Sequence, residues 1–150
     1  MDMDTINAGA VVAVTAGAVV LGVAAYELYK TYNAYQRGHN GVATDRVKIL
    51  EETFGEPMHT GTFTFNEAVT WMKSHFSEGC QGAIFRTDCA GLKSYAPNLN
   101  LGKEEENYLV MAIVDEASKT MRDRVLVKFD VLDSGLEDAL GDEGMLVIEP

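Results

Sequence analysis

The feature that most constrains the fold of this sequence is an uncharged apolar run near its amino terminus, from Ala8 to Tyr26. Its 19 residues are mainly Ala, Val and Gly. As an α-helix they would extend about 28 Å, close to the thickness of the hydrocarbon core of a bilayer. The run therefore predicts an N-terminal transmembrane helix, although a segment so rich in small residues inserts only moderately into lipid.

The residues that flank this run favour the membrane interpretation. Aromatic side chains collect at membrane interfaces, and four tyrosines follow the run at spacings of three: Tyr26, Tyr29, Tyr32 and Tyr35. No Lys or Arg precedes the run, and four follow it: Lys30, Arg37, Arg46 and Lys48. The positive-inside rule then places the C-terminal domain of a single-pass protein in the cytoplasm, with membrane lipid as a partner.

Two alternatives to a membrane anchor stay open. Small residues before Tyr26 allow signal cleavage near Ala25 and export, although the chain begins with acidic rather than basic residues. In a soluble assembly, the same helix would be buried between copies. Small residues at every fourth position allow close helix contact, which makes Gly9, Ala13 and Gly17 candidates for helix association.

The chain divides into an anchor at residues 1–37, a glycine-containing hinge at 38–43 and an acidic domain at 44–150. Alternating and continuous apolar segments in this domain predict an α+β fold, with a mostly antiparallel sheet of about five strands and two or three helices. The expected strands are 58–65, 82–87, 107–116, 123–132 and 145–149, and the expected helices begin near Thr44, Asn66 and Ser134. A long loop, 88–106, lies between them and is the first place to look for a binding surface.

Charge excludes one class of partner. Residues 49–150 hold 19 acidic and 8 basic side chains, and the whole chain has a net charge of -11. Such a surface repels phosphate backbones, so we expect no nucleic-acid binding.

Few side chains offer catalytic chemistry. Cys80 and Cys89 could serve a small thiol-dependent enzyme or redox protein, with His75 near Cys80 in the sequence. Together with His59 they also have the residue types of a zinc site, but not its paired spacing. We therefore expect no catalytic or metal-binding residues, no cofactor and no small-molecule substrate.

These observations favour a membrane-anchored, non-enzymatic accessory or protein-interaction module that self-associates or binds a protein partner. The only tryptophan, Trp71, lies off the main apolar stripe of its helix and could anchor a partner, although half-buried packing at the edge of the domain accounts for it better. The thiol-dependent enzyme and the soluble assembly protein are the alternatives.

Overall fold

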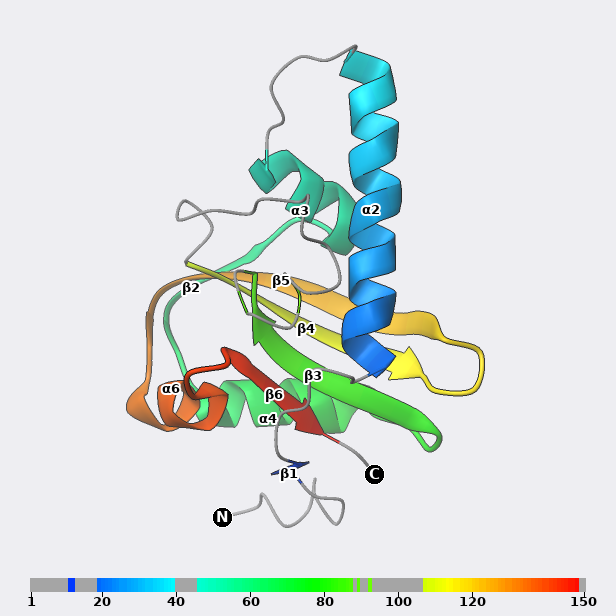
Figure 1. Cartoon of the computed structure of the whole chain (residues 1–150). Helices are drawn as coiled ribbons and strands as arrows, with labels where there is room; N and C mark the ends of the chain where they lie inside the picture. Colours follow the sequence, from blue (N-terminus) through cyan, green and yellow to red (C-terminus); the bar gives the residue numbers. More distant parts are fainter. Residues whose placement is uncertain are drawn as a thin grey trace.

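The computed structural model describes residues 11–12, 19–39, 46–87, 89, 92 and 107–148, in which four helices pack on a six-stranded sheet (Figure 1). The α+β class expected from the sequence is confirmed. The elements are β1 (Val11–Val12), α2 (Val19–His39), α3 (Arg46–Phe54), β2 (Met58–Phe63), α4 (Phe65–His75), β3 (Cys80–Arg86), β4 (Tyr108–Asp115), β5 (Thr120–Leu132), α6 (Ser134–Leu140) and β6 (Met145–Ile148).

The strand order is β1-β6-β3-β4-β5-β2, so β2 forms one edge and the two-residue β1 forms the other. β2 pairs in parallel with β5, for example Met58 with Val127, and the remaining pairs are antiparallel. The sheet is thus mixed, which corrects the expectation of a mostly antiparallel sheet. The parallel pair arises because the β2, α4 and β3 segment crosses over β5 and β4, which places β2 on the far edge.

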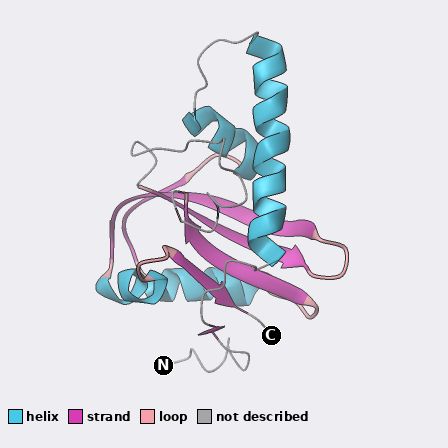
Figure 2. Cartoon of the chain, in the orientation of Figure 1, coloured by secondary structure: helices cyan, strands magenta, loops and turns pink. Residues whose placement is uncertain are grey.

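Helices cover both faces of the sheet, with α2 and α3 on one face and α4 and α6 on the other (Figures 1 and 2). The two-residue period of a strand divides β4 between two cores. Val110, Ala112 and Val114 contact the α2 side, whereas Leu109, Met111 and Ile113 contact the α4 side. β4 is therefore the buried central strand that its continuous apolar sequence predicts.

Helix α2 packs on the sheet with part of the apolar run. Val20, Leu21 and Leu28 have no exposed area, and the backbone N–H of Val20 donates to Oε1 of the buried Gln81 in β3, at 3.1 Å. Each such fully buried leucine contributes roughly 1.5–3 kcal/mol to stability. Of the apolar run, residues 8–10 and 13–18 lie outside the described residues, Val11–Val12 form β1, and the part from Val19 onward helps to form the core.

Within the described ranges, no helix combines the length and apolarity needed to cross a bilayer. α2 begins at Val19 and carries the charged residues Glu27, Lys30 and Arg37 from near its middle onward, so the expected long apolar helix is not found in the described part of the chain. Membrane attachment stays a prediction. α2 also continues through residue 39 into the expected hinge, and residues 40–43 of that hinge, like Thr44, lie outside the described part.

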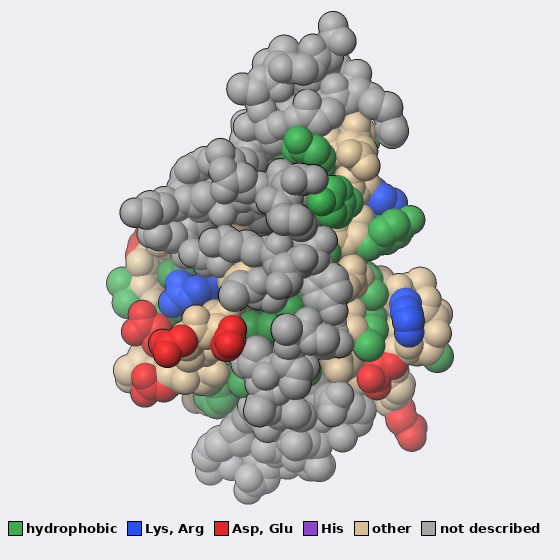
Figure 3. All heavy atoms as spheres, in the orientation of Figure 1, with side chains coloured by type: hydrophobic (Ala, Val, Ile, Leu, Met, Phe, Trp, Pro, Cys, Tyr) green, Lys and Arg blue, Asp and Glu red, His purple; other side chains and the backbone are tan. Residues whose placement is uncertain are grey.

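The surface is unevenly charged. Acidic side chains gather over α6 and the turn that follows it (Figure 3), where Glu137, Asp138, Asp142 and Glu143 are all exposed. A second copy of the chain would be repelled from this end of the molecule.

Candidate functional site

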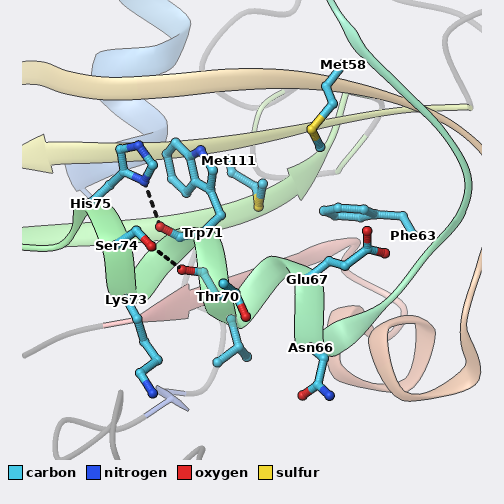
Figure 4. Close-up of a pocket in the computed structure, with 11 residues that line it drawn as sticks. Met58, Phe63, Asn66, Glu67, Thr70, Trp71, Lys73, Ser74, His75 and Met111 are labelled. Carbon is cyan, nitrogen blue, oxygen red and sulfur yellow. Dashed lines mark hydrogen bonds between the residues drawn. The ribbon is translucent and has the colours of Figure 1, made fainter.

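An open groove of about 640 Å³ runs between α4 and the β2 side of the sheet (Figure 4). We call it the α4–β2 groove. In Figure 4 the rings of Trp71 and His75 lie on the side of α4 nearest the strands, and Met58 and Phe63 approach from β2. The residues that line the groove are Met58, Phe63, Asn66, Glu67, Val69, Thr70, Trp71, Lys73, Ser74, His75 and Met111.

Two hydrogen-bonding motifs fix the start of α4. Thr64 caps the helix: its Oγ1 accepts from the N–H of Glu67 at 3.1 Å, and Glu67 Oε1 accepts from the N–H of Thr64 at 3.0 Å. The carboxylate of Asp133 accepts from the N–H of Phe65 at 3.2 Å and also caps α6 through the N–H of Leu136 at 2.8 Å. One side chain therefore holds the first turns of both helices together.

The opposite side of α4 approaches β3 closely at Gly82. A Cβ atom at this position would lie 3.0 Å from Met72 Sδ and 3.2 Å from Phe76 Cε1. The absence of a side chain lets the buried Met72 fill this space. α4 therefore sits over the middle of the sheet, and the β2 edge beside it stays open as the groove.

The walls and floor of the groove are mainly apolar. Met111 and Phe63 are buried, Trp71 is half-buried, and Met58 is 41% exposed. The Trp71 and His75 rings stack with centroids 4.3 Å apart, and His75 Nδ1 donates to the Trp71 carbonyl oxygen at 2.8 Å. The hydrogen bond orients the imidazole, and the stack places the indole against it, so Trp71 presents an apolar surface with polar groups around it.

The tyrosines expected at a membrane interface do not share one environment. Tyr26 is 62% exposed, and its ring lies 5.0 Å from Lys30 Nζ. Tyr29 and Tyr32 pack against the core beneath α2, and the side chain of Tyr35 lies outside the described residues. Gly9, Ala13 and Gly17, expected to associate helices, also lie outside the described part. Both roles remain predictions.

The two cysteines are buried and lie on opposite faces of the sheet. Cys80 belongs to the core on the α4 side and Cys89 to the core on the α2 side. Cys80 Sγ lies 3.3 Å from Ser77 Oγ, and His75 contacts Trp71 instead. His59 is exposed on β2. In the ranges that the structure describes, no three His, Cys, Asp or Glu side chains lie close enough together to hold a metal ion.

Sequence reasoning did not find the groove. The sequence identifies Trp71 as a candidate anchor. It does not show that Met58 of β2 and Met111 of β4 lie close to Trp71, because the three residues belong to different elements. Only the sheet order brings these side chains together. The loop at 88–106, the first choice for a binding surface, lies outside the described residues except for Cys89 and Leu92.

Comparisons of the chain with protein-family models, with curated proteins and with solved structures found no match.

Proposed function

We propose that this protein is a non-enzymatic protein-interaction module that binds a short segment of a protein partner in the α4–β2 groove. Apolar side chains of the partner would lie against Trp71, Met58 and Phe63. Polar groups along α4, such as Thr70 and Ser74, would contact the backbone or polar side chains of the same segment.

The main support is where exposed apolar surface lies. Among the described residues, the large hydrophobic side chains with high exposure are Tyr26, Met58 and Val131. Met58 lines the groove on the same side as Trp71, whereas Val131 lies on β5, opposite Thr62 of β2, and does not line the groove. Exposed apolar side chains that gather beside an aromatic anchor are typical of interaction sites. The groove volume also falls within the range of about 300–1,000 Å³ typical of binding pockets.

The position of the cysteines favours this function over thiol chemistry. A nucleophilic thiolate needs access to its substrate and an environment that stabilises its charge. Cys80 and Cys89 are instead buried among apolar side chains, with 0% and 3% exposure. The thiol hypothesis predicts rapid alkylation of one cysteine in the native chain, and the interaction hypothesis predicts slow alkylation of both.

Membrane attachment is not part of this proposal. In this fold, Val20, Leu21 and Ala24 contact the sheet, so these side chains do not face lipid. Binding in the groove is compatible with a chain that is attached to a membrane and with one that is not.

Selection from a random peptide library tests the proposal. The full chain is the bait, and a Thr70→Arg variant, which takes no part in the selection, is used afterwards to locate where the selected peptides bind. Thr70 is exposed on the groove wall, so arginine there fills the groove without disturbing the core. We expect selected peptides to share an apolar residue and to change the fluorescence of Trp71, the only tryptophan.

The control is Glu52→Arg, at an exposed position on α3 across the sheet. Selected peptides should bind this variant as they bind the original chain and should bind Thr70→Arg at least about tenfold more weakly, a difference of 1.4 kcal/mol. Equal binding to both variants, or no enriched peptide, would contradict the proposal.

A further inference from the structure

We infer that the outer edge of β2 pairs with β2 of a second copy of this chain, in antiparallel orientation and centred on Thr60. The two sheets would then form one continuous sheet across a two-fold axis. This inference concerns the backbone edge of β2. Met58 and Phe63 of the same strand line the groove, whereas Thr60, at the centre of the proposed pairing, does not.

β2 is available for pairing. It is the last strand in the sheet order, with β5 on its inner side and no strand on its outer side among the described residues. Met58, His59, Gly61 and Thr62 are exposed. Such an edge presents a row of backbone N–H and C=O groups to any extended chain that approaches it.

β2 also lacks the features that usually prevent edge pairing. Edge strands are commonly protected by charged side chains, prolines or bulges. Residues 57–66 contain no Asp, Glu, Lys or Arg, and Pro57 precedes the strand rather than interrupting it. The β2 and β5 register runs from Met58 with Val127 to Phe63 with Leu132 without a shift.

Charge favours a second copy at this edge over most other places on the surface. A chain with a net charge of -11 repels itself wherever acidic side chains would meet. Pairing centred on Thr60 places Met58 opposite Thr62, His59 opposite Gly61 and Thr60 opposite its own copy. Glu56, the nearest acid before the strand, would lie opposite Thr64, so no two acids meet in this register.

Pairing centred on Thr60 also gives better contacts between opposed side chains than pairing centred on Gly61. If the helices of both copies are to cover the same faces of the joined sheet, the two-fold axis must pass through a residue, and Thr60 and Gly61 are the two residues at the middle of β2. A shift of one residue in only one of the copies would place equivalent faces of the two sheets on opposite sides. Centring on Gly61 would place two glycines together, with no side chains to pair. Centring on Thr60 pairs two threonines, a favourable cross-strand contact, and covers part of the exposed Met58.

Two measurements on the full chain test the inference. Sedimentation equilibrium should show a dimer whose fraction rises with protein concentration. Thr60→Lys places two like charges opposite each other and should raise the dimer dissociation constant roughly fivefold or more. The control, Thr120→Lys at an exposed position where β5 begins, adds the same charge outside both β2 and the groove and should leave the constant unchanged.

Cross-linking checks the register independently of the lysine variant. Opposed residues in antiparallel strands have Cα atoms about 4.5–5.5 Å apart, within the range that a disulfide spans. Thr60→Cys should therefore form a covalent dimer under mild oxidation, and Thr120→Cys in the β4 and β5 hairpin should not. A chain that is monomeric at all concentrations, a dimer that Thr60→Lys leaves intact, or equal cross-linking from both positions would overturn the inference. If β2 pairs instead with a strand of another protein, the purified chain will be monomeric at all concentrations.

Discussion

The indole of Trp71 and the imidazole of His75 stack 4.3 Å apart, with their planes inclined by 20°. The pair occupies successive turns of α4 and forms part of the wall of the α4–β2 groove. Because the chain has only this tryptophan, its fluorescence reports directly on the groove.

Removing the imidazole should expose one face of the indole. We expect His75→Ala to shift Trp71 emission to longer wavelength and to increase its quenching by acrylamide. The free energy of unfolding should fall by less than about 1.5 kcal/mol, because His75 is exposed and loses one hydrogen bond. His59→Ala, on exposed β2, is the control and should leave the emission unchanged. Identical spectra for both variants would contradict the stacked geometry.

Asp133 should be important for stability although its side chain is only partly buried. Asp133→Ala removes the acceptor for Leu136 at the start of α6 and for Phe65 at the start of α4. We expect a loss of about 1–3 kcal/mol in chemical denaturation. Asparagine retains an oxygen that can cap both helices, so Asp133→Asn should lower the free energy of unfolding clearly less than Asp133→Ala. Equal losses in the two variants would show that helix capping is not the reason for the destabilisation.

The close approach of α4 to β3 should make Gly82 sensitive to a single added methyl group. Gly82→Ala would press against Met72 and Phe76, and we expect a destabilisation of about 1–3 kcal/mol. Gly135→Ala, in α6, is the matched control. A Cβ atom at this position would lie 3.6 Å from Phe65 Cβ, which is an ordinary van der Waals distance. That change should be neutral or slightly stabilising. Equal stability of both variants would contradict the packing described for α4.

Asp115 should make the β4 and β5 hairpin sensitive to acid. The N–H groups of Ser118 and Ala117 donate to its carboxylate at 2.9 and 3.0 Å, and Arg122 lies 3.5 Å away. Hydrogen bonding from Ser118 is the main reason that the pKa of Asp115 is lowered from its ordinary value of 3.8. A lowered folded-state pKa stabilises the fold above the unfolded value, and this contribution is lost as the pH falls through the folded value.

Thermal unfolding of an Asp115→Asn variant can measure this contribution. The original chain should have the higher midpoint at neutral pH, and the difference should shrink as the pH falls below 3.8 and disappear once the pH is below the lowered pKa of Asp115 in the folded chain. A difference that persists at the lowest pH would show that the effect does not depend on the charge of Asp115.

Local sequence patterns predicted much of the domain. The expected helix from Ser134 to Leu140 coincides with α6, because Asp133 caps it and Gly141 follows it with a positive φ of 62°. β4 and β5 follow from their continuous and alternating apolar patterns. α4 begins two residues earlier than expected because Thr64, rather than Asn66, caps the helix through a reciprocal bond with Glu67.

Long-range relations were not predictable in the same way. Nothing in the Met58–Phe63 segment specifies that it pairs with β5 rather than with a strand nearer in sequence, so neither the mixed sheet nor the groove beside β2 could be derived. The apolar run was ambiguous for a different reason. Ala and Val suit lipid and a packed core alike, and only the contacts of Val20, Leu21 and Ala24 identify the core.

The most direct test of the interaction function is site-specific photo-cross-linking in living cells that produce the full chain. A photoreactive amino acid replaces Thr70 on the groove wall or, as the control, Glu52 on α3 across the sheet. We expect one dominant protein adduct from position 70 that is absent from position 52 and is lost when Trp71→Ala is added. Adducts that are the same from both positions, or that survive Trp71→Ala, would contradict a partner site in the α4–β2 groove.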